Sequence, residues 1–169
     1  MLVWAACTEP ELLAEWWGPK GFTTPDMEID LRVGGGYRFA MQPLEGGLFY
    51  LNGKFREVDP PTRLAYTFRW ENTDPDDQET VVTISLRDAG DSTELIVDQG
   101  PFATEARRDL HHAGWTEWSR AAGGCAAVAR SSVRAGQRSR ISSKTCSSDS
   151  PAVISSGSFI AAGVLASLV

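Results

Sequence analysis

The sequence predicts an α+β domain over residues 1–118, built from six antiparallel strands with helices at both ends. Three observations predict it: apolar side chains recur with a period of two, helix signals flank these runs, and aromatic residues stop at Trp118. Of the 16 aromatic residues, Phe159 alone follows Trp118. Aromatic side chains supply much of the area that a core buries, so the folded unit is predicted to end there. Residues 119–169 are predicted to be an atypical tail rich in Ser, Arg and Ala, either disordered or derived from a frameshift.

A short helix is predicted near the N-terminus. Thr8 and Glu11 have the spacing of a capping box, and Pro10 is tolerated in a first turn. Gly18 and Pro19 then supply a stop signal. Between these signals lies an apolar stripe at helical spacing, formed by Leu12, Leu13, Trp16 and Trp17.

Six runs that alternate apolar and polar residues follow and are predicted as strands. The clearest carries Leu64, Tyr66, Phe68 and Trp70 on one face. Turn chemistry separates the runs, as in the three glycines at 34–36 and the Asp-Pro-Pro at 59–61. The predicted strands cover residues 27–33, 37–41, 49–55, 64–70, 81–87 and 93–99.

The last predicted element of the domain is a helix over residues 104–118. Thr104 is its expected N-cap. Ala106, Ala113 and Gly114 give it a face of small residues, which suits close packing across a concave sheet.

Charge argues against a nucleic-acid partner. Residues 1–118 carry 10 basic and 21 acidic side chains, and residues 119–169 carry 6 basic and 1 acidic. The predicted domain is therefore strongly acidic, whereas proteins that bind phosphate backbones present basic surfaces.

No catalytic, metal or cofactor site is predicted. His111 and His112 are adjacent on the predicted helix, about 100° apart, so they cannot both face one metal ion. The carboxylates Asp98, Glu105 and Asp109 lie near a helix start, where the helix dipole favours them without any catalytic role. The sequence contains no hydrolase triad order, HExxH or phosphate-binding loop.

A cytoplasmic location is expected. Cys7, Cys125 and Cys146 have no spacing typical of disulfide frameworks or zinc sites. The first residues lack the basic and long apolar regions of a signal peptide. The uncharged stretch after Asp149 approaches membrane-spanning length but is diluted by Ser and Gly, so a tail anchor is the less favoured alternative.

Four segments carry a family resemblance: TEPELLAEWWGPKGF at 8–22, MEIDLRVGGGYRFAM at 27–41, GKFREVDPPTRLAYTFRWE at 53–71 and HHAGWTEW at 111–118. The chain resembles the SRPBCC superfamily, which has the START-like helix-grip fold. Within it, the chain is similar to the homologue domain of the activator of heat-shock protein 90 ATPase. The resemblance implies a curved sheet around a C-terminal helix, with an apolar cavity between them. It also implies that the family's first strand is missing here, so that strand 93–99 is an open edge that promotes self-association.

The expected function is that of a non-enzymatic binding module for a small apolar or aromatic ligand. A co-chaperone-like protein-interaction domain is the first alternative, and a cyclase- or hydrolase-type enzyme is the second. Each inward-facing aromatic residue is ordinary core when taken alone, and the cavity hypothesis depends on the whole set. The residues expected to line the cavity are Phe39, Phe55, Tyr66, Phe68, Trp70, Leu110 and Trp115.

Overall fold

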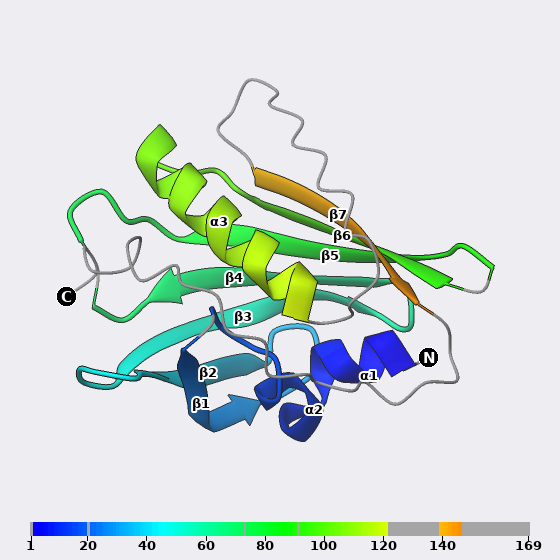
Figure 1. Ribbon diagram of the computed structural model, residues 1–169, viewed down its shortest axis with the longest axis horizontal. Helices are drawn as coiled ribbons and strands as arrows, with labels where there is room; N and C mark the ends of the chain where they lie inside the picture. Colours follow the sequence, from blue (N-terminus) through cyan, green and yellow to red (C-terminus); the bar gives the residue numbers. More distant parts are fainter. Residues whose placement is uncertain (1, 20, 73, 91, 122–138, 147–169) are drawn as a thin grey trace.

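The computed structural model describes residues 2–19, 21–72, 74–90, 92–121 and 139–146. A long helix crosses one face of a curved antiparallel sheet, and two short helices lie at one end of it (Figure 1). This is the helix-grip arrangement of an α+β fold that the sequence predicts.

The two short helices are α1, Leu2–Thr8, and α2, Pro10–Ala14. The predicted capping box at Thr8 is wrong. Thr8 ends α1, and its hydroxyl donates to the carbonyl of Trp4 at 2.9 Å. Glu9 is the N-cap of α2 and makes no side-chain cap bond. A threonine inside a helix can bond the carbonyl four residues before it, and this geometry satisfies the hydroxyl without a cap.

The six predicted strands are all present, and each pairs with the next in an antiparallel meander. They are β1 Phe22–Ile29, β2 Gly36–Pro43, β3 Phe49–Asp59, β4 Arg63–Trp70, β5 Thr80–Asp88 and β6 Ser92–Gly100.

The first strand lies earlier than the predicted range 27–33. Pairing stops at Ile29, and the chain turns through residues 30–35. The amide of Asp30 donates to the carbonyl of Gly36 at 2.9 Å and closes this turn. Val33 is therefore 62% exposed although it continues the apolar alternation. The alternation ran past the point where backbone pairing ends.

A seventh strand, β7, Ser139–Cys146, pairs antiparallel with β6 from Ser92 to Gln99. One expectation is thereby corrected, because strand 93–99 is not an open edge. The atypical tail over residues 119–169 stays a prediction. An unpaired strand presents obligatory backbone donors and acceptors, and the proline-free segment of β7 can satisfy them whatever its side chains are. The rest of the predicted tail, 122–138 and 147–169, lies outside the described residues.

Strands β2, β3 and β4 approach one another unusually closely at Gly53. The hydroxyl of Tyr37 on β2 donates to the carbonyl of Thr67 on β4 at 2.7 Å, passing over β3. A Cβ on Gly53 would lie 1.8 Å from that carbonyl oxygen and 2.7 Å from the Tyr37 ring. The Thr67 side chain is also buried, and its Oγ1 accepts from the amide of Lys54 at 3.0 Å. Only glycine fits at this crossing.

The long helix is α3, Glu105–Ala121. The predicted N-cap is confirmed, since the Thr104 hydroxyl accepts from the amide of Arg107 at 3.2 Å. Trp115 points from α3 to the sheet and is 7% exposed. Among the described residues, no helix is long and apolar enough to cross a membrane.

Candidate functional site

An apolar cavity lies beneath α1 and α2, against the face of the sheet formed by β1 to β5. Its free space is about 20 Å³, enough for a water molecule and too small for an organic ligand. The lining comes from the two short helices, the turn after α2 and strands β1 to β5. It comprises Cys7, Thr8, Leu13, Trp16, Trp17, Ile29, Tyr37, Phe39, Phe55, Leu64, Tyr66 and Ile84. No lining residue is Asp, Glu, Lys, Arg or His.

The strand side chains of the cavity reach it through the two-residue period of the sheet. Tyr37 and Phe39 share one face of β2, and their ring centroids are 4.9 Å apart. Phe55 and Tyr66 are directly paired across β3 and β4. Trp17, from the turn after α2, closes the cavity. Its ring packs edge-to-face with Phe39, and the two ring centroids are 5.3 Å apart. These aromatic ring contacts hold the walls of the cavity in place.

The three hydroxyl groups of the cavity lining differ in their hydrogen bonding. The hydroxyls of Thr8 and Tyr37 donate to backbone carbonyls. The hydroxyl of Tyr66, a residue that is 5% exposed, makes no hydrogen bond within the described part of the chain. Burial raises the pKa of Cys7 to about 12, and burial together with the nearby Cys7 raises the pKa of Tyr66 well above its ordinary value. The cavity is therefore uncharged at neutral pH.

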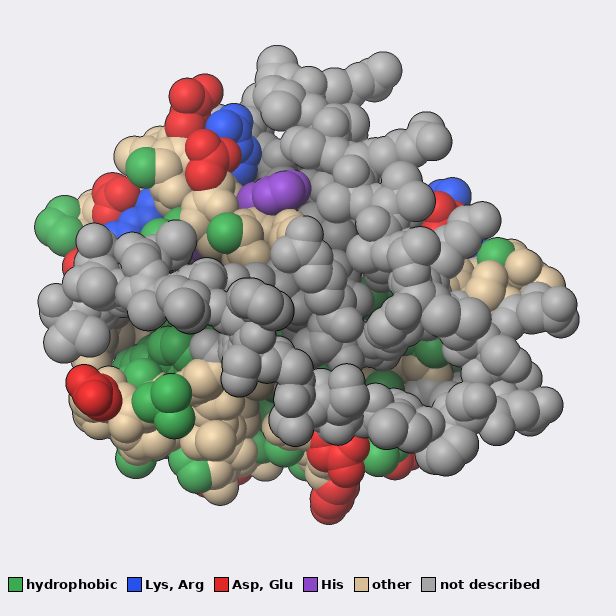
Figure 2. Space-filling model, viewed as in Figure 1, with side chains coloured by type: hydrophobic (Ala, Val, Ile, Leu, Met, Phe, Trp, Pro, Cys, Tyr) green, Lys and Arg blue, Asp and Glu red, His purple; other side chains and the backbone are tan. Residues whose placement is uncertain are grey.

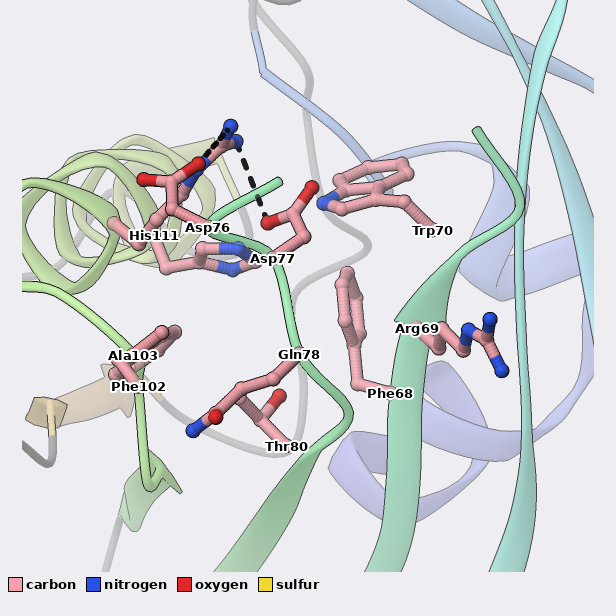
Figure 3. A pocket seen from close by; sticks show the side chains of 11 residues that line it. Phe68, Arg69, Trp70, Asp76, Asp77, Gln78, Thr80, Phe102, Ala103 and His111 are labelled. Carbon is pink, nitrogen blue, oxygen red and sulfur yellow. Dashed lines mark hydrogen bonds and ion pairs between the residues drawn. The ribbon is translucent and has the colours of Figure 1, made fainter. Parts of the chain in front are cut away.

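A second, polar pocket lies at the start of α3, and its free space of about 10 Å³ admits at most one water molecule. Figure 3 shows the carboxylates of Asp76 and Asp77, in the loop between β4 and β5, and its dashed lines mark their ion pairs with Arg107 of α3. Its guanidinium contacts Asp74, Asp76 at 2.8 Å and Asp77 at 3.4 Å. Hydrogen bonds from Arg107 hold the pKa of Asp76 below its ordinary value, whereas burial raises the pKa of Asp77. In the space-filling view, acidic and basic side chains lie together over this end of α3 (Figure 2).

His111 forms one wall of the polar pocket. Its ring lies 5.0 Å from Phe102 and 5.3 Å from Phe68 between centroids. Burial, with the positive charge of Arg107, lowers the pKa of His111 to about 4. The imidazole is thus neutral at pH 7. The indole nitrogen of Trp70 is also buried here and has no hydrogen-bond partner among the described residues. This pocket fastens a loop to a helix, and its size leaves no room for a substrate.

Within the described residues, no group of three His, Cys, Asp or Glu side chains is arranged to hold a metal ion. The apolar cavity is thus the candidate site for a ligand, and its lining offers shape and hydrogen bonds rather than charge.

The comparisons with known proteins identify the family. The family model described as "Activator of Hsp90 ATPase homolog 1-like protein" matches residues 1–121. The chain belongs to this family, AHSA1. A search of curated proteins gives no match.

Solved structures share the fold of this AHSA1 family member. A protein from Chromobacterium violaceum is 26% identical, with a TM-score of 0.63, over 69% of this chain and 81% of that one. The AHSA1 protein from Silicibacter pomeroyi is 27% identical, with a TM-score of 0.61, over 70% and 83%. A protein from Nitrosomonas europaea is 32% identical, with a TM-score of 0.57, over 69% and 79%. The resemblance seen in the sequence is confirmed.

The structure divides the residues expected to line a single cavity in this AHSA1 family member. Phe39, Phe55 and Tyr66 line the apolar cavity. Phe68 and Trp70 lie on the same face of β4 but border the polar pocket, nearer the start of α3. Leu110 and Trp115 are in the lining of neither. Trp115 instead packs edge-to-face with Trp17, with the two ring centroids 5.7 Å apart.

Sequence reasoning missed several residues that matter here. Tyr37 alternates with Phe39 and could have been found from the period of its strand. Gln99 could have been found in the same way, because it continues the inward face of Leu95 and Val97. No sequence pattern places Cys7 in the cavity lining, because its position there depends on how α1 packs on the sheet.

Gln99 is the centre of a buried polar chain and is 1% exposed. Its Oε1 accepts from the indole nitrogen of Trp115 at 2.6 Å, and its Nε2 donates to the hydroxyl of Thr80 at 2.8 Å. The chain links α3 to β6 and β5.

Replacing Gln99→Leu should lower the free energy of unfolding by about 2 kcal/mol, because the Trp115 indole loses the acceptor and the Thr80 hydroxyl loses the donor that Gln99 supplies. Urea unfolding followed by circular dichroism measures this. Gln78→Leu is the matched control, since Gln78 makes an exposed bond to the carbonyl of Pro101, and it should cost less than about 0.5 kcal/mol. Equal losses in the two variants would refute a structural role for the buried chain.

Proposed function

We propose that this domain binds a small apolar or aromatic molecule in the apolar cavity. The observation that carries the proposal is the composition of the lining, in which aromatic and aliphatic walls surround a few hydroxyl and thiol groups. Ligand sites are commonly built in this way, with apolar walls for affinity and sparse polar groups for orientation.

Binding requires the lid of the cavity to move, because the free space is only about 20 Å³. That lid is α1 and α2, of 7 and 5 residues. Isolated helices of this length are unstable in water, so tertiary contacts hold these two in place. Those contacts are made by Cys7, Leu13 and Trp17, whose side chains are buried over the cavity. A ligand that replaces the contacts can displace the helices without exposing the walls to water.

The domain is proposed to be a non-enzymatic binder. The titratable groups of the apolar cavity are Cys7, Tyr37 and Tyr66, and burial raises the pKa of each. They remain protonated at neutral pH, and a protonated thiol or phenol is a weak nucleophile and a weak base.

A co-chaperone-like interaction is the competing proposal. The description of the family supports it, as do two exposed apolar side chains in the turn after β2, Leu44 at 87% and Leu48 at 45%. Stimulation of a chaperone ATPase by the domain, lost on Leu44→Ser, would favour this role over ligand binding.

The ligand proposal is tested with N-phenyl-1-naphthylamine, a neutral apolar fluorescent probe. The chain should bind it saturably, and a flat aromatic competitor should displace it. Cys7→Leu places a larger side chain in the free space beneath the lid. It should lower the affinity for the probe by about tenfold or more, because a packed site accommodates added volume only at a cost in free energy. Fluorescence titration measures both effects.

Ala5→Leu is the control, because Ala5 lies on α1 but outside the cavity lining. It should leave probe affinity unchanged. Unsaturable uptake by the folded chain, or equal affinity in both variants, would contradict the assignment of the cavity.

A further inference from the structure

The Tyr66 hydroxyl is a polar group of the apolar cavity that makes no hydrogen bond in the described part of the chain. The hydroxyls of Thr8 and Tyr37 donate hydrogen bonds to backbone carbonyls, at 2.9 and 2.7 Å. Tyr66 is 5% exposed, lines the cavity and donates to no described atom. A hydroxyl that lines the free space of the cavity can donate to an acceptor placed there, so a ligand that supplies an acceptor is favoured.

The Tyr66 ring cannot turn its hydroxyl elsewhere. Its centroid is 5.3 Å from that of Tyr37 at an interplanar angle of 82°. On the other side it is 6.0 Å from Phe55 at 72°. The backbone on either side is paired with β3 and β5, opposite Phe55 and Val82. The position of the phenol oxygen is therefore restricted before any ligand arrives, and such preorganisation favours specific binding.

The charge of the cavity restricts the ligand further. Its lining contains no side chain that is charged at neutral pH, since Cys7 and Tyr66 stay protonated in their buried positions. A carboxylate brought here would lose its hydration and meet no cation, which is strongly unfavourable. Fatty-acid and other anionic ligands are thus disfavoured.

We propose that Tyr66 is the specificity-determining residue of the cavity and that its hydroxyl donates to the carbonyl oxygen of a neutral, largely apolar ligand. This inference rests on the proposed function and adds the chemical class of the ligand, a ketone or ester carried on a flat hydrophobic body.

Three probes with the same ring system test this inference: 2-acetonaphthone, 2-ethylnaphthalene and 2-naphthoate, each competed against N-phenyl-1-naphthylamine. Tyr66→Phe removes the hydroxyl and keeps the ring. This variant should lower the affinity for the ketone about fivefold to tenfold, which corresponds to the loss of one net hydrogen bond. Its affinity for the hydrocarbon should not change. The anion should bind the wild-type chain at least about a hundredfold more weakly than the ketone.

Tyr50→Phe is the matched control. Tyr50 lies on β3 outside the cavity, with its ring beneath the Arg38 guanidinium at 3.8 Å. Removing its hydroxyl should change the affinity for none of the three probes.

An infrared measurement on the wild-type chain gives a second readout that needs no variant. The carbonyl stretch of bound 2-acetonaphthone should lie below its frequency in hexane, as it does for a hydrogen-bonded ketone. In Tyr66→Phe the stretch should return toward the hexane value.

The outcomes separate the two proposals. Equal weakening of ketone and hydrocarbon by Tyr66→Phe, an unshifted carbonyl stretch, or tight binding of 2-naphthoate would overturn the assignment to Tyr66 and leave the cavity proposal standing. If neither the fluorescent probe nor the naphthalenes bind saturably to the folded chain, both proposals fall.

Discussion

Gly53→Ala should lower the free energy of unfolding by about 3 kcal/mol or more, or prevent folding altogether. The added Cβ would lie 1.8 Å from the carbonyl oxygen of Thr67, and real contacts of this kind are never so short. Because that oxygen belongs to the backbone of β4, relief requires β3 and β4 to separate. Separation would also break the bond from the Tyr37 hydroxyl to the same oxygen. Urea unfolding of the two proteins measures the loss.

Gly36→Ala is the control for this substitution, because Gly36 lies in the neighbouring strand opposite Lys54. A Cβ there would meet its nearest atom, the carbonyl oxygen of Gly53, at 3.8 Å, which is ordinary contact. Its effect should stay within about 1 kcal/mol. A Gly53 variant as stable as the Gly36 variant would show that β3 and β4 can separate without cost.

Acidification should destabilise the domain through His111, by about 3 kcal/mol between pH 6.5 and pH 4. The pKa of His111 falls from 6.5 to about 4 in the folded chain, because burial and Arg107 oppose its protonation. The unfolded chain therefore takes up the proton first. The stability that the neutral His111 contributes is fully present above pH 6.5 and is lost as the pH falls toward 4. Urea midpoints recorded across this interval measure the loss.

His111→Phe separates this effect from the titration of carboxylates such as Asp76, which also lose stabilising interactions in acid. Phenylalanine keeps the ring contacts to Phe68 and Phe102 and cannot be protonated. The variant should show a shallower decline than the wild-type chain over the same interval. Parallel pH profiles for the two proteins would place the acid sensitivity elsewhere.

The sheet could be predicted from the sequence where backbone pairing and side-chain burial coincide. In β4 the alternation of Leu64, Tyr66 and Phe68 matches three buried positions, each 5% exposed or less. The prediction was wrong at the end of the first strand, where Val33 keeps the apolar pattern after the ladder has ended. The two-residue alternation shows which side chains share a face. The end of a strand is set by the last hydrogen bond between backbones, and the side-chain pattern does not show where that bond lies.

The site was harder to predict than the fold for a related reason. Alternation shows that Tyr66 and Trp70 share one face of β4, but it does not show that α3 lies over the Trp70 end and α1 over the Tyr66 end. Those placements decide which residues meet the apolar cavity and which meet the polar pocket. Cys7 enters the lining for the same reason, through packing between elements far apart in the chain.

The order of strands in the sheet bears on how the domain folds. Each pairing from β1 to β6 joins neighbours in the sequence, so it closes a short loop at small entropic cost. The pairing of β6 with β7 joins Gln99 to Ser139, with α3 and its connections between them. Local contacts form quickly and distant ones slowly, so the meander and α3 can assemble first. We therefore expect β7 to dock last and to leave first, and the amides of β6 facing it to exchange with solvent sooner than those facing β5.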